Sequence, residues 1–283
     1  MNAGRKAAAR LLERARYEVI PTDSIEEAVV TFVPRDVTVT VTASPTKGLE
    51  ATIALAERLA AHGYVVVPHI SARLVVDDRH LSEISERLRA RAIDDIFVPA
   101  GDADPPAGRY DSALSLLVDL DKLGRPFSRI GITGYPQSHP RIDDDVTVQA
   151  MWDKRQYATY IVSNLCFDPS VVRRWIKRVR TRGVNLPIFF GLAGPVERTK
   201  LLNMATKIGV GESARFLSGH AEWFLRVGAP GGYNPGRLLA RTSATLADPA
   251  SDVEGLHLFT FNQVRQTEEW RAGVLATLDR GDG

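Results

Sequence analysis

A glutamate interrupts an apolar segment near the start of the chain. Glu18 lies in the run Tyr17-Glu18-Val19-Ile20-Pro21. Burying a carboxylate is unfavourable unless the group is paired or takes part in chemistry. We expect desolvation to raise the pKa of Glu18 and to make it a usable general acid. The alternative is an inward glutamate that bonds a side chain of a neighbouring strand, and the pattern alone favours neither.

Other polar groups stand where later apolar segments end. They are His69, Gly101-Asp102, Gly134-Tyr135-Pro136-Gln137-Ser138-His139-Pro140, Asn164 and Asn262. Each has a plain explanation when taken singly, such as a turn or a helix cap. If the segments are parallel strands of one barrel, their ends meet at one rim and surround one site. The set therefore indicates an enzyme, but it does not name a reaction.

Two further stretches could bind ions. The loop Ser44-Pro45-Thr46-Lys47-Gly48 precedes a helical pattern and could hold a phosphate, although a simple capped loop explains it equally well. The run Asp143-Asp144-Asp145 is better explained as an acidic helix N-terminus than as a cation site. Cys166 is the only cysteine, which excludes an intrachain disulfide and a multi-cysteine metal site. We find no HExxH, GxSxG or GxxxxGK[ST] motif and expect no metal.

The elements that must position these residues alternate along the whole chain. We predict eight strands, at Tyr17–Ile20, Val37–Val41, Tyr64–Pro68, Ile96–Pro99, Ile130–Thr133, Tyr160–Leu165, Pro187–Phe190 and Leu256–Phe259. Apolar strands separated by helical patterns indicate βαβ units and a parallel sheet. Eight such units in 283 residues favour an α/β protein with a single (β/α)8 TIM barrel. We expect one barrel domain over residues 1–283, with a leading helix within residues 1–16.

Several helix ends are recognisable in the sequence. Ser24 and Glu27 have the spacing of a capping box. The amphipathic segments Leu49–His62 and Pro169–Arg182 are each followed by a glycine that can end a helix. The second segment also carries a basic run, which we interpret as a solvated outer helix face.

Composition excludes several classes of protein. Lys and Arg number 36 and Asp and Glu 34, so the formal net charge is only +2. A dedicated nucleic-acid partner is not expected from this balance. The apolar segments are far shorter than the ~20 residues of a membrane-spanning helix, and Arg5–Arg16 lacks the apolar region of a signal peptide. We expect a cytoplasmic protein with no membrane partner, and the sequence indicates no particular oligomeric state.

Six segments, in order along the chain, resemble the methylenetetrahydrofolate reductase family. The segments are Tyr17-Glu18-Val19-Ile20-Pro21, Pro68-His69-Ile70-Ser71, Gly101-Asp102, Gly134-Tyr135-Pro136-Gln137-Ser138-His139-Pro140, Ser163-Asn164-Leu165-Cys166-Phe167-Asp168 and Leu256-His257-Leu258-Phe259-Thr260-Phe261-Asn262. The family is a flavin-containing barrel that reduces 5,10-methylenetetrahydrofolate to 5-methyltetrahydrofolate with NAD(P)H, in one-carbon metabolism. The resemblance implies that Glu18 is the general acid, that Asp102 lies close to the pterin, and that Asn164 replaces a pterin-binding glutamine.

The sequence departs from the family where the flavin is held. The family's arginine before Gly-Asp is Ala100 here, the Asp-Ala-Gly-Ala stretch before the sixth strand is absent, and Gln263 replaces an arginine. A lost guanidinium removes bidentate phosphate contacts that other residue types do not restore. We therefore expect no tightly bound FAD and direct hydride transfer from NAD(P)H.

The space at the rim would then receive the cofactor. His69, Tyr135 and His139 are the expected neighbours of the nicotinamide, and Ser44 and Thr46 are weaker candidates for its phosphates. Three alternatives remain open: the same reaction by a flavin-dependent ping-pong mechanism, a non-catalytic folate-binding barrel, and another barrel enzyme such as a lyase on a phosphorylated substrate.

Overall fold

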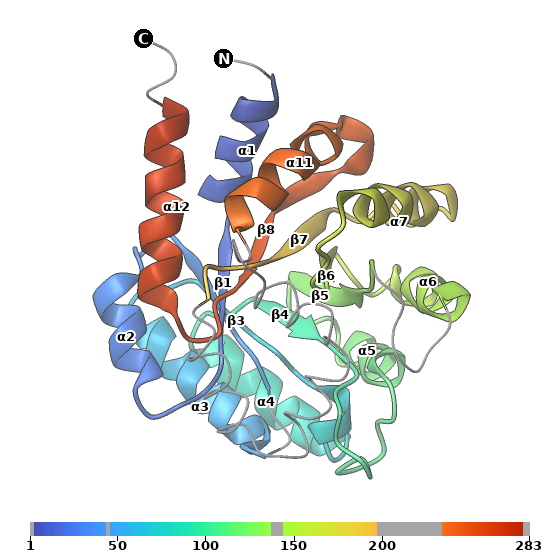
Figure 1. Cartoon of the computed structure of the whole chain (residues 1–283). Helices are drawn as coiled ribbons and strands as arrows, with labels where there is room; N and C mark the ends of the chain where they lie inside the picture. The colour runs from blue at the N-terminus through green and yellow to red at the C-terminus, as the bar shows by residue number, and fades with distance from the viewer. Residues whose placement is uncertain (1–2, 44–45, 137–143, 197–233, 280–283) are drawn as a thin grey trace.

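A single parallel sheet forms the centre of the molecule (Figure 1). The computed structural model describes residues 3–43, 46–136, 144–196 and 234–279. Within these ranges the strands are β1 (Arg16–Val19), β2 (Thr38–Val41), β3 (Val66–Pro68), β4 (Asp95–Val98), β5 (Arg129–Gly134), β6 (Tyr160–Ser163), β7 (Ile188–Ala193) and β8 (Val253–Phe259). Their order is β3-β2-β1-β8-β7-β6-β5-β4. The isolated parallel bridge between His69 and Phe97 joins the two ends, so the sheet is a nearly closed (β/α)8 barrel, as predicted.

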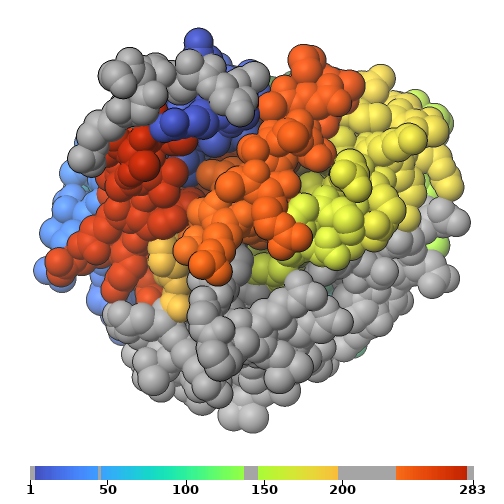
Figure 2. All heavy atoms as spheres, turned by 45° about the horizontal axis from the view of Figure 1, so that its top comes forward, coloured from blue at the N-terminus to red at the C-terminus, as the bar shows by residue number. Residues whose placement is uncertain are grey.

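Helices cover the outside of the barrel. They are α1 (Ala3–Glu13), α2 (Ile25–Phe32), α3 (Gly48–Ala61), α4 (Asp78–Ala90), α5 (Ala113–Lys122), α6 (Asp144–Lys154), α7 (Pro169–Thr181), α11 (Pro235–Ala247) and α12 (Val264–Asp279), with short 3-10 turns η1 (Ala72–Leu74) and η2 (Pro249–Ser251). The leading helix α1 packs against α11, which in turn contacts α7, and these three lie side by side on one face (Figure 2). Among the described residues, no helix is long and apolar enough to cross a membrane.

Two apolar layers hold the barrel together. The outer layer lies between strands and helices and includes Tyr17 and Val19 of β1. The inner layer lies inside the barrel and contains Val67, Phe97, Tyr160, Val162 and Phe189. Because side chains alternate along a strand, Glu18 points to the opposite side from its two neighbours, into the barrel.

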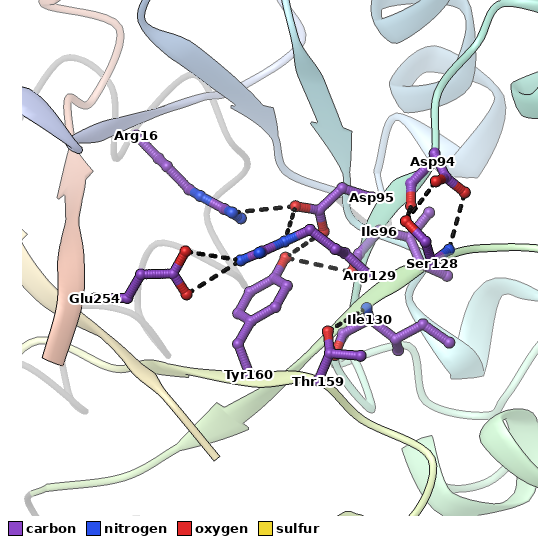
Figure 3. A network of polar contacts seen from close by, with 10 residues as sticks. All are labelled: Arg16, Asp94, Asp95, Ile96, Ser128, Arg129, Ile130, Thr159, Tyr160 and Glu254. Carbon is purple, nitrogen blue, oxygen red and sulfur yellow. Dashed lines mark hydrogen bonds and ion pairs between the residues drawn. The ribbon is translucent and has the colours of Figure 1, made fainter. Parts of the chain in front are cut away.

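An ionic network, buried at Arg16 and Asp95 and partly exposed at Arg129 and Glu254, lies at the N-terminal ends of the strands (Figure 3). Asp95 accepts from Arg16 Nη2 at 3.1 Å and from the Tyr160 hydroxyl at 2.7 Å, and lies 3.3 Å from Arg129 Nε. Arg129 also pairs with Glu254 at 3.2 Å. Burial raises the pKa of Asp95, even though two guanidinium groups oppose the shift. The network joins the starts of four strands to β8, at the opposite end from the polar groups predicted to do chemistry.

The predicted element ends are correct to within three residues, with one error in capping. Gly63 and Gly183 have positive φ values of 85° and 77°, which suits the position just after a helix. Ser24 precedes α2 but its side chain makes no cap hydrogen bond, so the predicted capping box was wrong. Its φ of −98° and ψ of −2° are helical, whereas a capping serine needs an extended backbone to reach the free N–H groups.

Candidate active site

Glu18 and His257 meet inside the barrel. In the register of the sheet Glu18 is paired with Phe259 of β8, and His257 lies two residues earlier on the same face. The Glu18 Oε2 and His257 Nε2 atoms are 3.0 Å apart, which is a hydrogen-bond distance. Their side chains are 17% and 2% exposed. The carboxylate is therefore paired, as a buried charge requires.

His69 completes a cluster of three ionisable groups. It follows β3, and its Nε2 lies 3.9 Å from Glu18 Oε2. The imidazole packs edge-on against Phe97 with ring centroids 4.7 Å apart, and stacks near the His257 ring at 6.3 Å. Its side chain is only 5% exposed. The structure thus brings together two of the predicted site residues, Glu18 and His69, and adds His257.

The electrostatics of Glu18 differ from the sequence expectation. Burial by itself raises the pKa of Glu18, but the hydrogen bond and positive charge of His257, helped by His69, hold it below its usual value. The expectation of a raised pKa was therefore wrong, because it did not include a histidine partner. Burial lowers the pKa of His69 to about 4, so this ring is neutral near pH 7.

Two imidazoles and a carboxylate are also donors that a divalent metal accepts. The ligand atoms of Glu18, His69 and His257 lie within 4.8 Å of one another. Their spacing is uneven, however, at 3.0 Å on one side and 3.9 Å on the other. The short contact is a direct hydrogen bond between Glu18 and His257, and we interpret the three residues as an acid–base cluster.

Asp102 and Tyr135 lie near each other in the loops after β4 and β5. Burial raises the pKa of Tyr135, and the negative charge of Asp102 raises it further. Asp102 is exposed to solvent. The preceding Gly101 has a φ of 88°, and a Cβ there would lie 1.7 Å from the Ser71 hydroxyl. Glycine is therefore required for the turn that presents Asp102.

Asn164 directly follows β6. Its backbone N–H donates to the Gly134 carbonyl at 2.7 Å, which extends the ladder by one residue. Its side-chain Oδ1 accepts from the Leu165 N–H at 2.7 Å. An asparagine side chain can offer a ligand one acceptor and one donor group, but here the oxygen is already engaged. The NH2 group is the half that is left to donate.

Other predicted residues lie elsewhere or outside the described ranges. Ser44 and His139 are outside the residues that the structure describes. Thr46 is exposed in the turn before α3. Asn262 accepts from the Ile20 N–H at 2.8 Å and donates to the Ile20 carbonyl at 2.9 Å, so it joins the loops after β1 and β8.

Sequence reasoning missed His257 as a functional residue. It appeared only inside a segment quoted for its resemblance to the family. A usable signal was present, since a histidine in the apolar run Leu256–Phe259 must be paired if it is buried. Its partner could not be identified without the register between β1 and β8.

A barrel with an acid–base cluster inside and polar loops at the carboxyl ends of its strands is the architecture of a (β/α)8 enzyme. The sequence model of the family described as methylenetetrahydrofolate reductase matches residues 22–212, about two-thirds of the chain. The chain belongs to the methylenetetrahydrofolate reductase family. Glu18 and His257 lie on either side of the matched range.

Solved structures show the same fold at low identity. The structure described as "C-terminal domain of putative chitinase" from Desulfitobacterium hafniense DCB-2 is 13% identical, with a TM-score of 0.51, over 93% of this chain and 98% of that one. A 7,8-dihydropteroate synthase from Vibrio fischeri ES114 is also 13% identical, with a TM-score of 0.44 over 95% of each chain. The first similarity shows the barrel fold alone.

Proposed function

We propose that this protein reduces 5,10-methylenetetrahydrofolate to 5-methyltetrahydrofolate by direct hydride transfer from NAD(P)H. Family membership supports a folate-related reductase. The observation that carries the finer proposal is the buried carboxylate of Glu18, hydrogen-bonded to His257 at 3.0 Å inside the barrel. A binding-only barrel has no use for a buried acid, which argues against the non-catalytic alternative.

The reaction needs one proton and one hydride. Protonation of N10 breaks its bond to the bridging carbon, and the bonding electron pair stays on N10. The lone pair of N5 then forms a double bond to that carbon, which becomes a 5-iminium cation. Hydride from C4 of the reduced nicotinamide adds to this carbon and gives the methyl group. The protein must hold the pterin and the nicotinamide together and exclude water.

The rim residues have distinct proposed roles. Asp102 accepts hydrogen bonds from the 2-amino and N3 hydrogens of the pterin, and the Asn164 amide donates to the pterin edge. His69 and Tyr135, with His139, lie beside the nicotinamide. Ser44 and Thr46 are weaker candidates for its phosphates.

We propose that flavin is absent because the residues at the positions where the family holds that cofactor are not arranged to bind its phosphates. Ala100 has no side chain that could bind phosphate. The neighbouring Arg73 is engaged by the loop itself, because it donates to the carbonyls of Ala103 and Asp111 at 2.6 and 3.3 Å. Before β6, Arg155 lies over the Trp152 ring at 3.5 Å and donates to its carbonyl at 2.6 Å. Neither guanidinium is positioned as a free phosphate clamp.

Steady-state kinetics test this proposal. The purified protein, with no added flavin, should oxidise NAD(P)H only when methylenetetrahydrofolate is present, and double-reciprocal plots should intersect, as a ternary complex requires. Parallel plots and activity restored by FAD would support the ping-pong alternative. Tight folate binding with no turnover in either case would support the non-catalytic barrel.

The proposed setting of the reaction is the cytoplasm. A single cysteine suits a reducing compartment. The product, 5-methyltetrahydrofolate, would supply methyl groups for methionine biosynthesis.

A further inference from the structure

We infer that the acid of this reaction is the Glu18–His257 pair rather than Glu18 alone, with His257 as a positioning residue that holds the proton between turnovers. This inference rests on the proposed function, because it assigns the proton that opens the methylene bridge. It adds His257 of β8 to the site. In addition to holding the Glu18 carboxylate in place by a hydrogen bond, His257 supplies the proton that Glu18 gives to the substrate.

The geometry of the pair is fixed by the fold. Glu18 and His257 lie on neighbouring parallel strands, and Phe259 packs edge-on against the His257 ring with centroids 4.8 Å apart. The Thr260 hydroxyl donates to the Glu18 carbonyl at 2.5 Å, which ties the end of β8 to β1. With 2% of its side chain exposed, His257 has little freedom to turn away. The Nε2 atom is therefore held on the carboxylate before any substrate binds.

The charge state of Glu18 explains why a second proton carrier is needed. An ionised carboxylate cannot donate a proton, and the partner histidine holds the pKa of Glu18 below its usual value. In the inferred resting state His257 carries the proton as an imidazolium, whose Nε2–H donates to the ionised Glu18 carboxylate across the 3.0 Å contact. The imidazolium passes its Nε2 proton to Glu18 Oε2, and the carboxylic acid formed in this way gives its proton to N10, which leaves a neutral imidazole and a carboxylate. The pair has then lost one proton, which it regains from water after product release.

The groups around the carboxylate leave His257 as the proton carrier. The ionisable residues that act on Glu18 among the described ranges are His257 on β8 and His69 after β3. On β2, the residue paired with Glu18 is Thr40, which does not ionise in this range. Burial keeps His69 neutral down to about pH 4, so His69 carries no proton to give at neutral pH.

A carboxyl titration tests the pair without any need for activity. In protein with 13C-labelled glutamate carboxyls, the Glu18 signal is assigned as the one that Glu18→Gln removes. In His257→Gln the amide still donates a hydrogen bond, but the charge is gone and burial remains. The titration of Glu18 should then move upward by about one pH unit or more. If the titration of Glu18 is unchanged in His257→Gln, the inference that the two residues act as a pair is wrong.

The pH dependence of kcat tests whether the reaction uses the proton carried by His257. At pH 8, His257→Gln should lower kcat by about 10²-fold, the lower end of what a positioned acid contributes, because the ionised Glu18 then has no proton to give. The loss should be recovered as the pH falls, because Glu18 then binds a proton by itself. A variant that is merely misfolded would show no recovery, and a wild-type rate at pH 8 would contradict the inference.

A matched control exists on the surface. His62 contacts Glu26 of α2 with the same 3.0 Å separation, but His62 directly follows α3 and is 42% exposed. His62→Gln should leave both the kcat profile and the Glu18 titration unchanged. If the parent protein oxidises no NAD(P)H with methylenetetrahydrofolate, the proposed function fails. If the parent is active and His257→Gln behaves like His62→Gln, the proposed function stands and the inference that His257 supplies the proton is wrong.

Discussion

Glu18 and His257 are separated by 239 positions in the chain, yet their side chains meet at 3.0 Å inside the barrel. The contact exists because β1 and β8 are the first and last strands of a closing sheet and pair in parallel. A carboxyl group from near the start of the chain is therefore paired with an imidazole from near its end. Any description of the site from either half alone is incomplete.

Replacement of Glu18 tests its role as the proton donor. Glu18→Gln keeps the shape and removes the acid, so turnover should fall by about 10²–10⁴-fold, with folate binding retained. Glu83→Gln is the control, because Glu83 pairs with Arg79 on the exposed face of α4. Measured turnover near the parent value in Glu18→Gln would rule out this assignment.

Loss of the pterin contacts should weaken folate binding. Asp102→Ala and Asn164→Ala should each reduce the affinity for 5-methyltetrahydrofolate by about 1–3 kcal/mol, since partner groups on the pterin are left unpaired. Titration calorimetry gives the affinity, and Asp111→Ala is the control from the same long loop. If both variants bind as tightly as the parent, the pterin lies elsewhere.

The acid–base cluster should make stability depend on pH. Burial lowers the pKa of His69 from 6.5 to about 4, so the unfolded chain binds a proton that the folded protein refuses. Proton binding to the unfolded chain lowers the free energy of unfolding. The contribution of His69 to stability is therefore complete above pH 6.5 and is lost as the pH falls toward 4. The lowered pKa of Glu18 acts in the same direction at still lower pH.

Urea unfolding across this range measures the effect. The free energy of unfolding should fall by up to a few kcal/mol between pH 6.5 and pH 4, and His69→Gln should flatten the dependence. An equally steep fall in His69→Gln would show that other groups are responsible.

The buried network at the other end of the barrel should be needed for stability. Arg16→Met leaves Asp95 with one guanidinium, 3.3 Å away, and removes a cation that lies 3.8 Å from the Phe189 ring. Breaking a buried pair costs about 3–5 kcal/mol of unfolding free energy. Arg79→Met removes an exposed pair whose arginine side chain is 87% accessible, and should cost less than about 1 kcal/mol. Equal losses of unfolding free energy in the two variants would show that the network stabilises the protein no more than an exposed ion pair does.

The sequence was sufficient for the fold because its signals are local. Eight apolar segments separated by helical patterns determine a barrel, and glycines such as Gly63 mark helix ends. The capping of α2 was not predictable, because the spacing of Ser24 and Glu27 does not specify the backbone angles that a cap needs.

The site was only partly predictable, because its chemistry depends on register. Glu18 could be identified as an unusual carboxylate, but its pKa depends on a histidine from a strand far away in sequence. The pairing of β1 with β8, and the inward direction of His257, come from the closed sheet. The engaged oxygen of Asn164 likewise depends on how the chain turns after β6.

Isotope transfer is the most direct test of flavin-free reduction. The purified protein, with its visible spectrum recorded first, is given methylenetetrahydrofolate and NAD(P)H deuterated at the transferred position of C4. The account predicts no flavin absorption and one deuterium atom in the methyl group of 5-methyltetrahydrofolate, without washout to solvent. Stoichiometric bound flavin, or a methyl group whose new hydrogen comes from water, would contradict it.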